Sequence, residues 1–228
     1  MNPLSRYAGC ALLTLLLWMH GPVWAQSTGA YVGHDVRGST VQVEGERATA
    51  HLTFYAPDVV RVDWTAPGAA RPDSSVAVVQ EANAALPSVQ ERDDALWVRG
   101  EEVAVHVQKD PLQLRFTKAD GTPLTRESAP YTREDEGHQL AFHLDDSTNV
   151  YGTGERAGSL NLRGQAFDLY NTQQYGYQEA PPEMKVNVPL AVTNSGYGLY
   201  VDTTWPTRFD IGAAESNTFS VDVEGGAL

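Results

Sequence analysis

Cysteine is nearly absent from the 228-residue sequence, and the single one, Cys10, lies near the N-terminus. It precedes the apolar run of its segment, whereas the cysteine of a lipoprotein attachment site would follow that run, so we expect no lipid anchor. Once the N-terminal segment is removed, the chain can form no disulfide and has no thiol chemistry. Its hydrophobic core alone must hold the fold, and about 200 residues suffice to bury such a core.

A hydrophobic run long enough to cross a bilayer, about 20 residues, is also missing. The nearest approach, Ala11–Met19, follows Arg6 and precedes the small-residue sequence VWA, which ends at Ala25. This order is that of a secretory signal peptide with cleavage before Gln26. We therefore predict a signal peptide over residues 1–25, an exported protein that is periplasmic or secreted, and no membrane attachment after cleavage.

Clusters of positive charge are missing as well. Lysine and arginine total 16 against 29 aspartates and glutamates, for a formal net charge of −13, or −14 once Arg6 is removed (−13 − 1). Binding to a phosphate backbone needs clustered cations, so we exclude nucleic acid as a partner. The acidity indicates solubility and a neutral or cationic partner.

Helical periodicity is the last absence, because no window of a dozen residues shows a convincing 3.6-residue apolar repeat. Apolar and polar residues alternate instead, most clearly over residues 47–57 and 58–67, which predicts strands. Turn residues separate such runs at Asp120–Gly121 and Asn194–Gly196. The alternation places these side chains on one face: Ala50, Leu52 and Phe54 in the first run, and Val60, Val62 and Trp64 in the second.

Many short strands with Gly, Pro, Asn and Asp between them predict an all-β fold, a β-sandwich. The charged stretch Glu127–Gly137, ESAPYTREDEG, is predicted to be an exposed connection. We find no internal repeat and no linker, so residues 26–228 are expected to form one domain.

Catalytic and metal chemistry have little support in the residues. His106, His138 and His143 lack a second ligand at useful spacing, so we predict no metal and no cofactor. The GxG of YGTGER, residues 151–156, precedes loop and strand instead of the helix that a phosphate site needs, so we expect its glycines to permit tight backbone geometry, with Glu155 and Arg156 as a local pair. Carboxylates are too abundant for a pair to be assigned to glycoside hydrolysis: Asp145, Asp146, Glu155, Asp168, Glu179 and Glu183.

The stretch LYNTQQYGYQ, residues 169–178, has a more coherent chemistry. Side-chain amides both donate and accept hydrogen bonds, which matches the vicinal hydroxyls of sugars, and tyrosine rings offer flat apolar faces to pyranose C–H groups. The alternative is that the tyrosines pack on the sandwich while the amides are merely exposed. The residues concerned are Tyr170, Asn171, Gln173, Gln174, Tyr175, Tyr177 and Gln178.

Three further stretches are distinctive: NVYGTGERAGSLNLRGQAFDLYNTQQYGY (Asn149–Tyr177), VNVPLAVTNSGYGLYVDTTWPTRFDIG (Val186–Gly212) and VEGGAL (Val223–Leu228). Together, and in this order, they resemble the N-terminal domain of glycoside hydrolase family 31, the α-glucosidase family. The resemblance implies a galactose-mutarotase-like β-sandwich that precedes a (β/α)8 barrel, expected after residue 228. In the family the barrel supplies both catalytic aspartates, so the resemblance assigns no catalytic residue to this chain.

The resemblance also implies that the loop after the Tyr-Asn pair reaches over the mouth of the barrel. Asn171, Thr172 and Gln173 fall on that loop, and Tyr175 and Tyr177 complete the predicted substrate-binding set. Many α-glucosidases have an aspartate at the place of Gln173, whereas NTQQYGY is more similar to the branch of oligosaccharide α-1,4-glucosyltransferases. A plain α-glucosidase and an α-xylosidase stay open.

The expected function is that of an accessory domain of an exported retaining α-glycoside hydrolase or transglycosylase. Its partners would be an α-linked oligosaccharide substrate and its own C-terminal catalytic barrel. Two other hypotheses stay open. One is a free-standing carbohydrate-binding β-sandwich, which would bind sugar through Tyr175 and Tyr177 without a barrel. The other is an aldose 1-epimerase, which rests on fold analogy alone.

Overall fold

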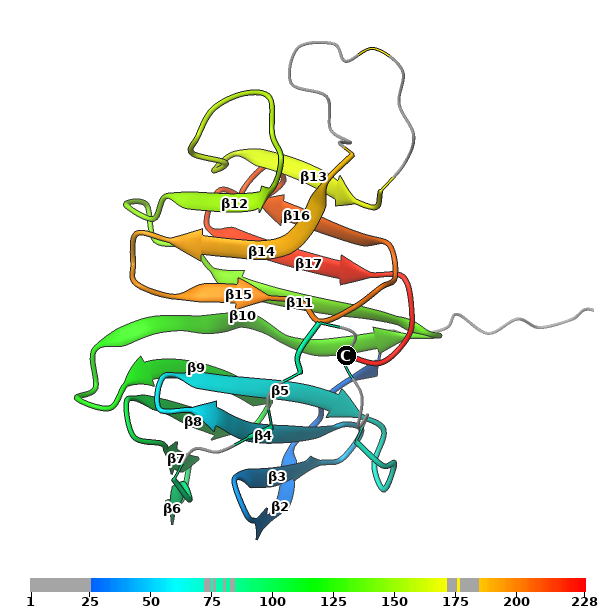
Figure 1. The fold of residues 1–228 in the computed structure, drawn as a ribbon. Coiled ribbons are helices and arrows are strands. Elements are labelled where there is room, and N and C mark those ends of the chain that lie inside the picture. The colour runs from blue at the N-terminus through cyan, green and yellow to red at the C-terminus, as the bar shows by residue number, and fades with distance from the viewer. Residues whose placement is uncertain are drawn as a thin grey trace, which may run out of the picture.

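The computed structural model describes residues 26–71, 75, 77–79, 81–82, 85–171, 176 and 185–228. The predicted signal peptide, residues 1–25, lies outside this described part. Over the residues described, the chain forms seventeen strands and no helix, so no helix there could span a membrane. The all-β class predicted from the alternation is confirmed (Figure 1).

Three antiparallel sheets make up the fold (Figure 1). The first contains β2 (Tyr31–Arg37), β3 (Thr40–Gly45), β4 (Thr49–Ala56) and β5 (Val59–Thr65) in that order. The second contains β12 (Val150–Gly154), β14 (Asn187–Thr193) and β15 (Gly198–Tyr200). The third and largest is ten-stranded and runs in the order β13 (Gln165–Leu169), β16 (Thr207–Ile211), β17 (Thr218–Val223), β11 (Gly137–His143), β10 (Pro123–Glu134), β9 (Leu112–Lys118), β8 (Val103–Lys109), β7 (Ala95–Arg99) and β6 (Ser88–Glu91), with β1 (Gln26–Ser27) paired to β10.

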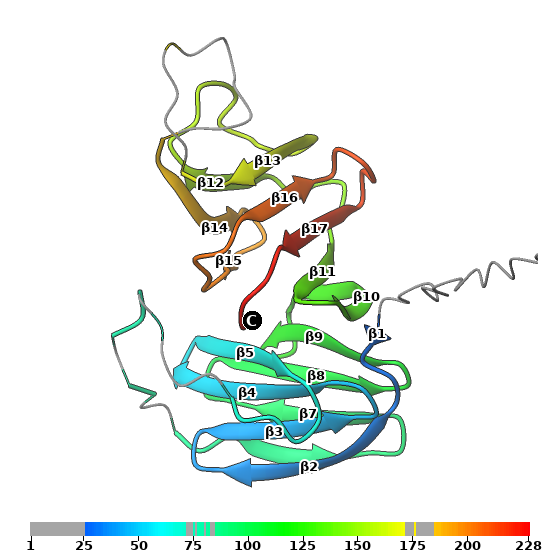
Figure 2. The same cartoon turned by 90° about the vertical axis from the view of Figure 1, so that its right-hand side faces the viewer.

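The ten-stranded sheet passes through two halves, each with its own hydrophobic core. In the N-terminal half it faces β2–β5, and in the C-terminal half it faces β12, β14 and β15 (Figure 2). Phe116, Leu140 and Leu228 pack against both cores and join them. The alternating residues predicted to share a face lie in the first core: Ala50, Leu52, Phe54, Val60, Val62 and Trp64.

The turns predicted at Asp120–Gly121 and at Asn194–Gly196 connect β9 to β10 and β14 to β15. The prediction of an exposed connection over Glu127–Gly137 is wrong. Strand β10 continues to Glu134, and both Glu127 and Tyr131 are buried. Pairing with β11 shifts register twice along this stretch, and such bulges let a strand accommodate a proline. The prediction failed because charged residues and a proline dominate this stretch, while few of its side chains point into the core.

A chain of contacts closes the seam between the halves. The rings of Trp64 and Tyr131 stack with centroids 4.7 Å apart. The Tyr131 hydroxyl lies 2.7 Å from His138 Nδ1, and His138 Nε2 lies 3.1 Å from the Gly226 carbonyl. Because a carbonyl can only accept, Nε2 carries the proton and Nδ1 accepts from Tyr131. Burial lowers the pKa of His138 and raises that of Tyr131 to about 12, so both stay neutral at pH 7.

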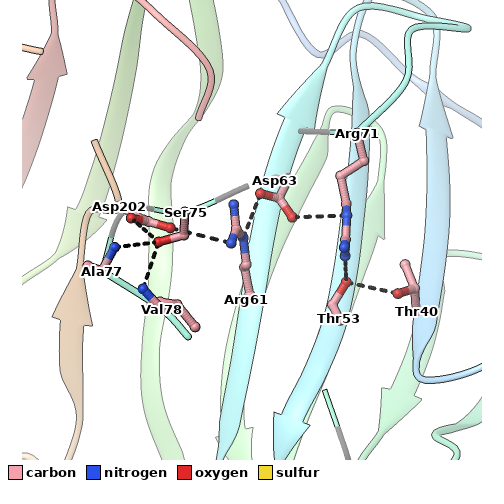
Figure 3. A network of polar contacts seen from close by, with 9 residues as sticks. All are labelled: Thr40, Thr53, Arg61, Asp63, Arg71, Ser75, Ala77, Val78 and Asp202. Atoms are coloured by element: carbon pink, nitrogen blue, oxygen red, sulfur yellow. Dashed lines mark hydrogen bonds and ion pairs between the residues drawn. The ribbon is translucent and has the colours of Figure 1, made fainter. Parts of the chain in front are cut away.

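A second set of polar contacts ties β5 to the C-terminal half (Figure 3). Arg61 Nε donates to Asp63 at 2.7 Å, and Arg61 Nη1 lies 3.3 Å from Asp202, which follows β15. Asp202 also accepts from the Ser75 hydroxyl at 2.9 Å. Burial raises the pKa of Asp63, while Arg61 and Arg71 oppose the rise. The network fixes how the four-stranded sheet meets the segment after β15.

Candidate functional site

Asn171, the first of the predicted substrate-binding residues, follows β13. Asn171 comes directly after Tyr170 and is exposed. Thr172, Gln173, Tyr175 and Tyr177 lie outside the described residues. The structure therefore locates where this set begins on the fold, and their predicted sugar contacts stay a prediction.

Asn171 ties the end of β13 to the beginning of β14. Its side-chain oxygen accepts from the Asn187 main-chain N–H at 2.8 Å and from the Asn187 amide at 3.2 Å. The same Asn187 amide donates to the Tyr170 carbonyl at 3.0 Å. These bonds hold the end of β13 against the beginning of β14. We call this place, formed by Tyr170, Asn171 and Asn187, the loop base. Asn171 positions this base, a role that the sequence did not indicate.

Strand β12 pairs with β14 next to the loop base. Gly152 and Gly154 have φ angles of +109° and +89°, and a Cβ at either would meet main-chain oxygens of β14 or of Val186 just before it. The Glu155 N–H donates to the Val186 carbonyl at 2.9 Å and extends the pairing. The two glycines of YGTGER therefore permit close backbone contact, as predicted, and they set the spacing of β12 and β14.

Arg156 contacts the two strands β12 and β13 near the loop base. Its guanidinium lies over the Phe167 ring at 4.7 Å, and its Nε donates to the Thr153 hydroxyl at 2.8 Å. Burial lowers its pKa. Glu155 and Arg156, predicted to be a local pair, form no ion pair in the structure, and Arg156 Nη1 donates instead to the Glu155 main-chain carbonyl at 3.3 Å. Arg156 therefore joins β12 to β13.

An open cleft of about 900 Å³ lies beside the loop base, on the outer face of the ten-stranded sheet. Antiparallel register aligns four polar side chains along it, one from each neighbouring strand: Asp168, Arg208, Asp222 and Gln139. Arg208 donates to Asp168 at 2.6 Å, and this hydrogen bond is the main reason that its pKa is raised. Burial raises the pKa of Asp222. Sequence reasoning missed this row, because alternation shows each residue's face and not its cross-strand neighbour.

Two of the carboxylates considered for catalysis have a basic side chain beside them. Asp168 faces Arg208, and Asp145 lies 3.1 Å from His143. Glu179 and Glu183 lie outside the described residues. Over the described part of the chain, no group of three or more His, Cys, Asp or Glu side chains gathers where it could hold a metal ion.

One family model matches most of the chain. It is described as the glycosyl hydrolase 31 N-terminal galactose mutarotase-like domain and matches residues 49–210. Among characterised proteins, alpha-glucosidase 2 of Bacillus thermoamyloliquefaciens is 29% identical over 190 residues, covering 78% of this chain and 23% of that protein. Isomaltosyltransferase of Sporosarcina globispora is 25% identical over 188 residues, covering 77% of this chain and 16% of that protein.

The fold also recurs among solved structures. A glycoside hydrolase family 31 dextranase of Flavobacterium johnsoniae in complex with glucose matches with a TM-score of 0.83 at 23% identity, covering 89% of this chain and 26% of that chain. At this identity the likeness shows the fold alone. The present chain spans about a quarter or less of the length of the curated relatives named above, 23% and 16%.

Proposed function

The chain belongs to the glycosyl hydrolase 31 N-terminal galactose mutarotase-like domain family, and from this premise we propose that it is the accessory domain of a longer, exported α-glycoside hydrolase or transglycosylase. The galactose-mutarotase-like β-sandwich predicted from sequence is confirmed. In the proposal the domain supports a catalytic (β/α)8 barrel and contributes one loop to that barrel's substrate site.

The construction of the loop base is the observation that carries the proposal. The hydrogen bonds from Asn187 to Asn171 bring the two ends of the intervening segment together. Close contact between β12 and β14 and the packed Arg156 make the base rigid. A firmly held base at the point where a tyrosine- and amide-rich stretch of sequence begins suits a loop that contributes to a neighbouring site.

An α-linked oligosaccharide of glucose is the proposed substrate class. The relatives support it by their names, which include an alpha-glucosidase and an isomaltosyltransferase, and a matching dextranase structure contains isomaltotriose. The proposal places Asn171, Thr172, Gln173, Tyr175 and Tyr177 at the edge of the sugar site. Export, through cleavage of the signal peptide over residues 1–25, is part of the same proposal.

Activity of residues 26–228 tests the proposal against its rivals. The purified domain should not hydrolyse or transfer α-glucosides, whereas the longer protein encoded by the same gene should. A titration of isomaltotriose and maltotriose into the domain should show no saturable binding in the micromolar range. Micromolar affinity that Tyr175→Ala or Tyr177→Ala removes would support the free-standing binding module instead. Accelerated mutarotation of glucose by the domain would support an epimerase.

A further inference from the structure

Strand β14 has its large apolar residues on the face that points away from the core. Val188, Leu190 and Val192 point outward and are exposed by 37%, 37% and 44%. The opposite face, toward the C-terminal core, carries small or polar residues: Asn187, Pro189, Ala191 and Thr193. A half-buried antiparallel strand normally shows the reverse, apolar residues inward and polar residues outward.

Strand β17 of the ten-stranded sheet provides a comparison within the same half. There Phe219, Val221 and Val223 are buried, while Thr218, Ser220 and Asp222 lie on the outer face. Both strands belong to the same half and cover the same core. The C-terminal half therefore has the ordinary pattern on β17 and the reverse pattern on β14.

Neighbouring residues enlarge the apolar surface. Val186 precedes the strand and is exposed, and Tyr200 of β15 pairs with Leu190 in register. On the other side Tyr151 of β12 pairs with Val192. Residues paired across antiparallel strands share a face, so these side chains lie together. We call this surface the β14 face; it comprises Tyr151, Val186, Val188, Leu190, Val192 and Tyr200, and it contains no charged residue.

We propose that the β14 face is the docking surface for an apolar surface of the catalytic barrel in the same polypeptide. Contiguous exposed apolar patches of this kind mark interaction sites in soluble proteins. The inference rests on the proposed function, because the barrel is the occupant. Two observations select that occupant. The curated relatives extend far beyond the part that this chain matches. In addition, the β14 face adjoins the loop base, since Asn187, held by Asn171, is the first residue of β14.

Cysteine labelling measures whether the face is covered. Residues 26–228 contain no cysteine, so a single introduced thiol reports its own accessibility. The test variant is Val192→Cys, and the matched control is Val36→Cys on β2, because both valines lie on strands and are 44% exposed. Each variant is made in residues 26–228 and in the longer protein encoded by the gene, and its rate of reaction with a maleimide is measured. The longer protein without the substitution provides the background.

The Val192→Cys thiol should react at least about tenfold more slowly in the longer protein than in residues 26–228, the protection that about 1.4 kcal/mol of docking gives. The Val36→Cys thiol should react at similar rates in both. Equal rates for Val192→Cys in both would overturn the inference and leave the proposed function standing. Slow reaction in residues 26–228 together with a dimeric mass would also overturn it, in favour of a second copy. A gene that encodes no barrel would remove the proposed function, and the inference with it.

Discussion

Glu127 provides the sharpest test of the packing around β10. It lies on β10, only 5% of its surface is exposed, and its Oε2 accepts one hydrogen bond, from the Leu114 N–H at 2.7 Å. Burial raises the pKa of Glu127 from 4.5 to about 8. The carboxyl group is therefore protonated in the folded protein at neutral pH, and ionised once the chain unfolds.

The size of the effect follows from this pKa difference. Between pH 4.5 and about pH 8 the folded state keeps the Glu127 proton, whereas the unfolded state has already released it. The stability due to this proton is fully present below pH 4.5 and is lost as the pH rises through 8. At about 1.4 kcal/mol per pKa unit, the loss amounts to at most roughly 5 kcal/mol. This is a large share of the stability of a domain, which is about 5–15 kcal/mol.

Urea unfolding of residues 26–228 from pH 4.5 to 8.5 measures the loss. The wild type should lose several kcal/mol across this range relative to Glu127→Gln, whose side chain is neutral throughout and can still accept from Leu114. His51, His106 and His138 have pKa values lowered by burial, which acts in the opposite direction, but their effect is common to both proteins and cancels. The exposed Glu136 provides the control, since Glu136→Gln should follow the wild-type curve. Parallel curves for wild type and Glu127→Gln would refute the reasoning.

Three further substitutions test the loop base and the seam. Gly154→Ala should destabilise the domain by more than the ~1 kcal/mol expected for Gly121→Ala. Both glycines have φ near +90°, but only at Gly154 does a Cβ meet main-chain atoms. Chemical denaturation compares the two variants, and equal losses of stability would contradict the tight β12–β14 spacing. Asn171→Ala should cost about 1 kcal/mol and speed proteolytic cleavage after β13, whereas unchanged cleavage would mean that the Asn171–Asn187 bonds do not hold the base. Tyr131→Phe should cost about 1–3 kcal/mol, because His138 Nδ1 loses its buried donor; a thermal melt that matches wild type would exclude that hydrogen bond.

The candidate site was accessible to sequence reasoning only in part. The motif YGTGER identified two glycines whose backbone geometry the structure confirms. Asn171 was singled out for its sugar chemistry, yet its described contacts are with Asn187, 16 residues along the chain. Hydrogen bonds of that kind depend on which strand ends meet, and strand order across a sheet cannot be deduced from local alternation. The row from Asp168 to Gln139 was missed for the same reason.

Local patterns in the sequence determined the all-β class, the turns and the side chains of β4 and β5 that enter the core. Alternation and turn residues act within a few positions, so one chain segment carries the whole signal. Only the tertiary structure decided that β10 is a strand, that Trp64 stacks on Tyr131, and that the apolar face of β14 lies outside. Each of these depends on what lies opposite a residue across the fold. For β14 the apolar signal was present in the sequence, but a buried face and a face awaiting a partner have the same pattern of residues.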